Sequence, residues 1–176
     1  QDVFIEHVGI PTLPAVRQAV EALQEMDMHR TVRLIVSGGI RSGADVAKAL
    51  ALGADAVSVG TAALIALNCN APLFEEDYAA LGTKAGSCHH CHTGKCPVGV
   101  ATQDANLEAR LNVDEATRRV RNYLATLTLE AQTLARACGK SHVLNLEPED
   151  LAALTVEAAA MAGVPLAGTS WIPGKN

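Results

Sequence analysis

The sequence predicts an α/β fold with a parallel sheet, and the first 67 residues carry the observations that support it. Strand-like and helix-like segments alternate there, and glycines follow the strand-like segments. Strands that alternate with single helices are typical of βαβ units with right-handed crossovers. In chain order the expected segments are a strand at 2–10, a helix at 13–26, a strand at 32–37, a helix at 43–53, a strand at 54–60 and a helix at 61–67.

The helix expected over 13–26 depends on apolar side chains that recur every three or four residues and so share one helical face. Those side chains belong to Leu13, Val16, Val20, Leu23 and Met26. The segment 32–37 is instead a continuous apolar run rich in β-branched residues, and 54–60 has the character of the next strand. Such runs indicate strands that are buried on both faces of a parallel sheet.

The character of the chain changes in residues 68–103, which contain Asn, Pro, Gly and several closely spaced cysteines. We expect this stretch to form mainly an ordered loop around a site. The following residues turn helical, with one helix expected over 112–139, capped by Asn112, and another over 148–163. A loose tail is expected after the second helix.

The composition is that of a soluble globular protein. Of the 176 residues 49% are hydrophobic and 19% are charged, and the net charge of -5 is spread without long runs. This balance excludes a disordered chain and gives no basic surface for nucleic acid or anionic membranes. No apolar stretch approaches the roughly 20 residues that a membrane span needs. Three of the five cysteines crowd one loop, which favours metal binding in the cytosol over a disulfide framework.

Two strand-to-helix turns have the residues of a phosphate site. Ser37, Gly38 and Gly39 follow one expected strand, and Gly60 and Thr61 follow the next. Glycines at such turns let backbone N–H groups approach an anion closely, and the following helix adds its N-terminal dipole. Adjacent βα turns often form one phosphate site in barrels. The alternative is that these glycines only satisfy tight turns.

The most distinctive feature is the run "CHHCHTGKCP", in which Cys88, Cys91 and Cys96 have C-x2-C-x4-C spacing and Pro97 follows directly. A cysteine–proline pair that ends a closely spaced cysteine run is typical of iron–sulfur ligation. Three thiolates suit a three-iron cluster, since each iron needs one protein ligand. Cys69 is either the fourth ligand of a four-iron cluster or a small buried apolar residue.

Zinc is the alternative metal, with His89, His90 or His92 as a fourth ligand. Structural zinc usually takes its ligands from two separated pairs, and the chain has one CxxC, so the spacing favours iron–sulfur. Unliganded reactive thiols are a third interpretation. Cys138, in an expected helix, is interpreted as structural.

Three stretches together resemble, in order, the C-terminal part of the FMN-binding synthase domain of glutamate synthases. The similarity is greatest to the archaeal-type and glutamate-synthase-like branch, which includes a subunit of N-methylglutamate synthase. It covers essentially the whole chain, and its last motif is highly specific. The stretches are "IEHVGIPT", "LIVSGGIRSGADVAKALALGADAVSVGTAAL" and "CHTGKCPVGVATQD".

The resemblance implies the C-terminal part of a TIM (β/α)8 barrel of the FMN-dependent type, followed by a cluster loop and a helical extension. The implied segments are 1–67, 68–103 and 104–176. The resemblance further implies FMN, with its phosphate on the two glycine turns described above, and a [3Fe-4S] cluster. The implied cluster ligands are Cys88, Cys91 and Cys96.

The activity implied by the resemblance is that of an oxidoreductase acting on CH–NH2 donors. In the family, ammonia combines with 2-oxoglutarate and the imine is reduced by FMN to give glutamate. Electrons reach the flavin through iron–sulfur centres from a reductase or ferredoxin-like donor. Two other readings stay open: an N-methylglutamate synthase subunit that uses methylamine, and a zinc-stabilised binding module without redox activity.

The sequence departs from the family pattern in two ways. In the larger glutamate synthases five residues separate the first two cluster cysteines, whereas Ala85 occupies that position here and Cys88 lies closer to Cys91. A full barrel takes roughly 250 residues, whereas this chain has three strand-like runs. We therefore expect a fragment or one half of a split barrel, associated with a chain that supplies the earlier strands. Catalytic residues cannot be assigned, although Glu6 and His7 end the first expected strand.

Overall fold

The computed structural model describes residues 7–175 and has a mixed α/β fold. The chain divides into two compact units. The first combines the residues up to Val59 with those from Leu127 onward, and the second is Gly60–Thr126. Most of the strand expected at 2–10, including Glu6, lies outside the described residues, and the described part, 7–10, forms no strand.

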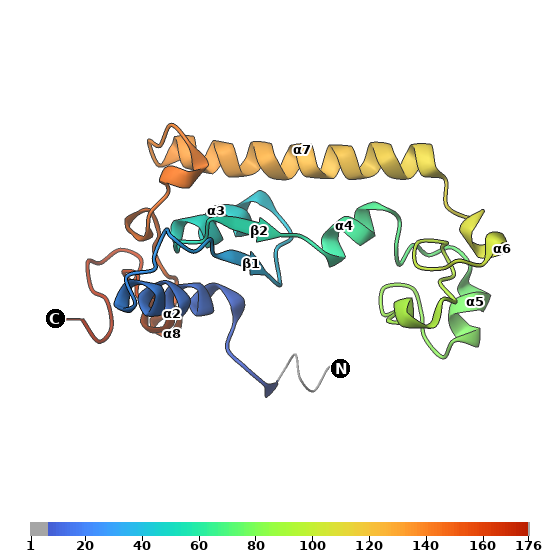
Figure 1. The fold of residues 1–176 in the computed structure, drawn as a ribbon, viewed down its shortest axis with the longest axis horizontal. Coiled ribbons are helices and arrows are strands. Elements are labelled where there is room, and N and C mark those ends of the chain that lie inside the picture. The colour runs from blue at the N-terminus through green and yellow to red at the C-terminus, as the bar shows by residue number, and fades with distance from the viewer. Residues whose placement is uncertain (1–6, 176) are drawn as a thin grey trace. The chain divides into compact units, whose positions relative to one another are not determined.

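The first unit contains the predicted parallel βαβ arrangement (Figure 1). Strand β1 (Ile35–Ser37) pairs in parallel with β2 (Ala56–Ser58), so that Ser37 lies opposite Ser58. Helix α3 (Gly43–Ala51) connects the two strands. Helix α2 (Thr12–Glu25) precedes them and packs against β1. The parallel pairing and the two helices confirm the sequence prediction for this part of the chain.

The prediction that both strands are buried on both faces was wrong for this chain in the absence of any partner. Val36 of β1 is buried, but Ile35 is 64% exposed, and in β2 Ala56 and Ser58 are exposed. The physical reason is the size of the sheet, because the two strands bury side chains on one face, at Val36 and in part at Val57, and leave the other face exposed. Parallel sheets normally have both faces covered.

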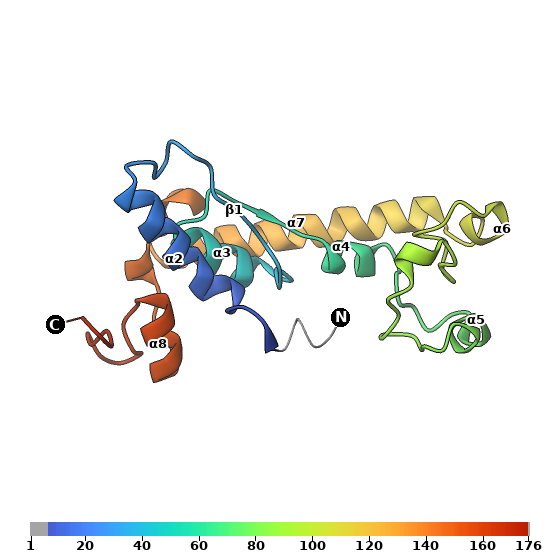
Figure 2. The same ribbon diagram turned by 60° about the horizontal axis from the view of Figure 1, so that its bottom comes forward.

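The main core lies between the helices of the first unit. Helix α2 buries Val16 and Val20, and α3 contributes Ala49 and Leu50 to the same cluster. Helix α8 (Val156–Ala162) lies beside α2, as both views show (Figures 1 and 2). The spacing of three or four residues therefore identified the correct face of α2.

Helix α7 (Val113–Ala137) confirms the long helix predicted over 112–139. Asn112 caps it as expected, since the Glu115 N–H donates to Asn112 Oδ1 at 3.0 Å. In the first unit the C-terminal part of α7 meets the start of α3. There the Gly43 N–H donates to Glu130 Oε2 at 2.7 Å, and a Cβ on Gly43 would lie 2.6 Å from the Ala131 N atom. Only glycine allows this close contact.

The helix predicted over 148–163 begins later than expected. Residues Pro148–Asp150 form only a 3-10 turn, η3, and Ala153 forms a β-bridge with Leu166. Helix α8 then begins after Thr155, whose Oγ1 accepts a hydrogen bond from the Ala158 N–H at 3.2 Å. The segment therefore forms a capped 3-10 turn and then a separately capped short helix, where a single longer helix was predicted.

The tail that was predicted to be loose is folded into turns. In one of these turns the Leu166 N–H donates to the Trp171 carbonyl at 3.0 Å. A further 3-10 turn, η2 (Val143–Asn145), packs on α3.

The second unit consists mainly of loops with short helices, as the prediction for residues 68–103 indicates. Its elements are α4 (Thr61–Ala66), α5 (Glu75–Ala80), the 3-10 turn η1 (Cys91–Thr93), α6 (Ala105–Glu108) and the first part of α7 (Figure 2). Helix α5 was not predicted. A small core of Tyr78, Cys96 and Val98 holds α5 to the cysteine loop. Among the described residues no helix combines the length and apolar character that crossing a membrane requires.

Candidate functional site

Four cysteines of the second unit line one small pocket. They are Cys69, Cys88, Cys91 and Cys96, and the other lining residues are Asn70, Tyr78, His90, Pro97 and Val98. All five cysteines of the chain are free thiols, and the fifth, Cys138, is exposed at the end of α7. The structure therefore brings together the three predicted ligands and the candidate fourth. Cys138 lies outside the pocket, and the prediction that it is a structural residue within a helix was wrong, because it is exposed just after the end of α7.

A compact turn positions Cys91 and Cys96. Cys91 opens η1, the Thr93 hydroxyl donates to the His90 carbonyl at 2.8 Å, and the Lys95 N–H donates to Thr93 Oγ1 at 3.2 Å. Gly94 has a φ of +72°, in the left-handed region that glycine occupies without strain. The chain can therefore reverse within the four residues between the two cysteines.

A second set of interactions positions Cys69 and Cys88. Cys69 stands between Asn68 and Asn70, whose φ values of 83° and 60° lie in the left-handed region. Asn tolerates this region better than most residues. The Cys88 N–H donates to Asn70 Oδ1 at 3.2 Å. This bond ties the two segments together, although 18 residues separate its partners.

Arg110 fastens the cysteine loop to α5. Its Nη1 donates to the Pro97 carbonyl at 2.9 Å and to Asp77 Oδ2 at 3.0 Å. The guanidinium also lies over the Phe74 ring, 4.4 Å from its centroid. Because Pro97 directly follows Cys96, these contacts fix the end of the cysteine run.

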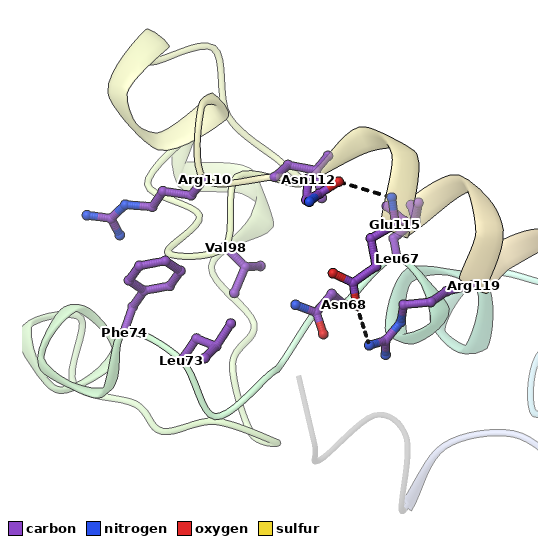
Figure 3. Close-up of a pocket in the computed structure, with 11 residues that line it drawn as sticks. Leu67, Asn68, Leu73, Phe74, Val98, Arg110, Asn112, Glu115 and Arg119 are labelled. Carbon is purple, nitrogen blue, oxygen red and sulfur yellow. Dashed lines mark hydrogen bonds and ion pairs between the residues drawn. The ribbon is translucent and has the colours of Figure 1, made fainter.

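Arg110 also lines a neighbouring pocket of about 120 Å³, drawn in Figure 3. On the α7 side of that pocket Glu115 and Arg119 form an ion pair at 4.0 Å, one helical turn apart, and Arg119 Nε donates to the Ala66 carbonyl at 3.1 Å. The charged groups of this pocket therefore have protein partners. Its contacts serve the packing of α4, α5 and α7 within the second unit.

The electrostatics of the thiol pocket favour a cationic occupant. Burial raises the pKa of the Cys69 thiol, and the Cys91, Cys96 and Cys88 thiolates nearby raise it further. Several thiolates held together repel one another unless a positive charge compensates them. Metal binding supplies that charge and releases the thiol protons.

The donor chemistry fits an iron–sulfur cluster. Cysteine thiolates are the usual ligands of such clusters. Among residues 7–175 no group of three or more His, Cys, Asp or Glu side chains is arranged to hold a metal ion. In a cluster each thiolate binds a different iron, so the sulfurs need not converge on one point. Of the three candidate histidines, only His90 lines the pocket, while His89 and His92 are exposed.

The two glycine turns follow the paired strands as predicted. Gly38 and Gly39 come directly after β1, with φ values of +109° and +73°, and Gly60 precedes α4. All five residues assigned to the phosphate site are exposed: Ser37, Gly38, Gly39, Gly60 and Thr61. His7, at the end of the first expected strand, is exposed in the first unit.

The two helices that follow these turns differ in how their N-termini are satisfied. In α3 the Glu130 carboxylate accepts the Gly43 N–H, and Asp45 closes a capping box with Ser42. Burial opposes ionisation of Asp45, but the Arg41 and Ser42 N–H groups hold its pKa below the usual value. Helix α4 begins without a side-chain cap. An anion would therefore meet carboxylates at α3 but not at α4.

The sequence analysis did not identify three residues that line or support the thiol pocket in the structure, namely Tyr78, Asn70 and Arg110. The Asn-Cys-Asn stretch at 68–70 was a signal for a left-handed turn, because asparagine favours that conformation. Arg110 and Tyr78 gave no signal in the sequence, since their roles depend on contacts with distant residues. Glu130 belongs to the same class, because it reaches a residue 87 positions away.

Comparison with known proteins gives consistent matches. Residues 1–141 match a family described as "Conserved region in glutamate synthase". A glutamate synthase large subunit-like protein of Rhizobium meliloti is 67% identical over the whole chain, which corresponds to 40% of that protein. An archaeal glutamate synthase [NADPH] of Methanocaldococcus jannaschii is 40% identical over 82% of this chain and 25% of its own length.

A third relative, the archaeal-type glutamate synthase [NADPH] of Dehalococcoides mccartyi, is 35% identical over 94% of this chain. The match spans 31% of that protein. The chain thus spans between a quarter and two fifths of the length of these relatives. On the extent of the family match and of the identities, the chain belongs to the glutamate synthase family.

Proposed function

We propose that this chain is the part of a glutamate-synthase-type oxidoreductase that binds an iron–sulfur cluster and the phosphate of FMN. The observation that carries the proposal is the shared pocket of Cys88, Cys91 and Cys96 in a chain of this family. In this proposal residues 1–67 are the last βα units of an FMN-binding TIM barrel. Residues 68–103 hold the cluster, and residues 104–176 are a helical extension.

The three cysteines act as thiolate ligands, and the hydrogen bonds around them keep the loop in shape for binding. Gly94 and the Thr93 hydroxyl hold the turn between Cys91 and Cys96, and Asn70 holds the Cys88 backbone. Arg110 anchors the end of the run through Pro97. When bound, the cluster would pass electrons singly to FMN, and the flavin would reduce the imine of 2-oxoglutarate and ammonia to glutamate.

For FMN, the proposed contacts are the backbone N–H groups of the two glycine turns. Ser37 and Ser58 are directly paired, so the first unit holds the turn at Gly38 and Gly39 at the edge of the sheet where β1 ends. The proposed share of Gly60 and Thr61, which belong to the second unit, rests on the family resemblance. The start of α3 adds little, because Glu130 and Asp45 already accept hydrogen bonds there.

The partners in this proposal follow from the reaction and from the exposed strand face. A chain or segment with the earlier barrel strands would cover the exposed side of β1, and a reductase or ferredoxin-like donor would supply electrons. The two archaeal-type relatives above carry NADPH in their names. Whether the amine is ammonia or methylamine is decided by comparing the products formed from 2-oxoglutarate with each amine.

The proposal is tested by cysteine substitution in protein purified without oxygen, together with any chain that co-purifies. We expect Cys91→Ser to lose most of the bound iron and acid-labile sulfide. The matched control is Cys138→Ser, which removes an exposed thiol outside the pocket and should retain both. Full iron and sulfide in Cys91→Ser, or equal loss in the control, would contradict the ligand assignment. Zinc in place of iron in the unsubstituted protein would favour the binding module.

A further inference from the structure

Tyr78 has a buried hydroxyl group without a hydrogen-bond partner in the described part of the chain. The side chain is 1% exposed, and its oxygen is shielded from solvent. Burying a hydroxyl without a partner is unfavourable, so buried polar groups in native proteins are nearly always bonded to protein, water or ligand. The unpaired hydroxyl therefore indicates that it forms a hydrogen bond with a group that is present when the site is occupied.

The phenol lies at the thiol pocket. Tyr78 lines that pocket together with Cys69, Cys88, Cys91 and Cys96. It also belongs to the small core that contains Cys96, against which Cys88 packs. The other polar side chains that line the pocket are Asn70, whose Oδ1 already accepts the Cys88 N–H, and His90, so four of the six polar side chains that line it with Tyr78 carry sulfur.

The backbone that carries the Tyr78 ring is held in place within α5. In α5 the Tyr78 N–H donates to the Phe74 carbonyl at 3.2 Å, and the adjacent Asp77 is fixed by Arg110 at 3.0 Å. Arg110 simultaneously holds Pro97, the residue after Cys96. The same guanidinium therefore sets the position of the phenol relative to the cysteine run.

A phenol is protonated near neutral pH, because its ordinary pKa is about 10, and it can therefore act as a hydrogen-bond donor. Thiolate and sulfide sulfurs carry negative charge and accept hydrogen bonds.

We propose that the Tyr78 hydroxyl donates a hydrogen bond to a sulfur of the cluster held by Cys88, Cys91 and Cys96, and so raises the reduction potential of that cluster. The inference rests on the proposed function. A reduced cluster carries one more negative charge than an oxidised one, so a fixed donor stabilises the reduced form more. Tyr78 is in this account a positioning residue that tunes the potential and binds no iron.

The test is the midpoint potential of the cluster in Tyr78→Phe, measured by a redox titration followed by electron paramagnetic resonance. The substitution removes the hydroxyl and keeps the ring. We expect the potential to become more negative by about 59 mV, which is a tenfold change for a one-electron couple. The matched control is Tyr123→Phe, which removes the other phenol of the chain, one that does not line the pocket, and should leave the potential unchanged.

A structural role of the hydroxyl would give a different result. Removing an unpaired buried hydroxyl should leave the unfolding temperature of the metal-free protein unchanged or higher. An unchanged potential, or a clearly lower unfolding temperature of metal-free Tyr78→Phe, would overturn the inference. Absence of iron and sulfide from the unsubstituted protein would instead refute the proposed function itself.

A second measurement covers the case in which Tyr78→Phe does not fold. The chain has two tyrosines, so 3-fluorotyrosine incorporated into the Tyr123→Phe variant labels Tyr78 alone. The fluorinated phenol is more acidic and donates a stronger hydrogen bond. The potential should then become more positive than in unlabelled Tyr123→Phe, and no change would overturn the inference.

Discussion

At the scale of single residues, Cys69 raises the question whether the cluster has a fourth cysteine ligand. It lines the same pocket as the three expected cluster ligands, between two asparagines in the left-handed region. We predict that the reduced protein takes up a fourth iron when ferrous iron is added, because a fourth thiolate is at hand. Cys69→Ala should keep the three-iron form and take up none. The conversion is measured by iron analysis and electron paramagnetic resonance, and equal uptake by Cys69→Ala would refute the prediction.

The spacing of residues 88–97 was enough to predict which thiols gather, because ligands so close in sequence need only a tight turn. Gly94 supplies that turn through its left-handed conformation. Tyr78 and Arg110 could not be predicted in the same way. Their contacts depend on how α5 and the residues after α6 pack on the loop, and no local pattern encodes that.

At the scale of elements, Asp55 links the segments that lead into the two strands. Its Oδ2 accepts the Leu34 N–H at 2.8 Å, and Arg33 Nη1 donates to its Oδ1 at 2.9 Å. The Leu34 N–H and the Arg33 side chain lower the pKa of Asp55. A lowered pKa in the folded state means that Asp55 stabilises the fold at pH values above its unfolded pKa of about 3.9.

We predict that this stabilisation is lost as the pH falls below about 4 and through the folded pKa. Asp55→Asn should therefore lower stability near neutral pH and weaken the decline on acidification. Thermal unfolding between about pH 6 and about pH 3 measures both effects. Glu25→Gln, at an exposed position late in α2, is the control. An unaltered acid dependence in Asp55→Asn would contradict this role.

The contact between α3 and α7 gives a second prediction at this scale. A methyl group at position 43 would lie 2.6 Å from the Ala131 N atom, in the backbone of α7. Because backbone cannot move aside cheaply, Gly43→Ala should destabilise the protein by about 1–3 kcal/mol. Gly60→Ala is the matched control, since a Cβ there has nothing within 4 Å. Urea denaturation measures the free energy of unfolding of both variants. Equal stability would contradict the prediction, since it would mean that α3 and α7 can move apart without loss of stability.

The elements that the sequence predicted well are those with strong periodicity or caps, such as α2 and α7. Helix α5 was missed because its six residues are too few to establish a period. The start of α8 was misplaced because Pro148 also suits a single 3-10 turn. The burial of β1 and β2 was overestimated because an apolar run is typical of strands covered on both faces, whereas in the described residues these two strands have one exposed face.

At the scale of the whole molecule, the exposed face of β1 calls for a covering partner. Ile35 is 64% exposed on a strand whose composition is that of a buried one. We predict association with a chain that supplies further strands, or self-association when the chain is alone. Light scattering tests this. Ile35→Lys should reduce association, whereas Leu154→Lys, at an 87% exposed position away from the strands, should not. A monodisperse monomer of the unsubstituted chain would contradict the prediction.

The central claim is that this chain carries the cluster site of a glutamate-synthase-type enzyme. The most direct test is the content of iron, acid-labile sulfide, zinc and flavin per chain in protein purified without oxygen. The account predicts about three iron and about four sulfide per chain, as a [3Fe-4S] cluster requires, with FMN when the partner strands are present. About one zinc per chain, with neither sulfide nor flavin, would contradict it.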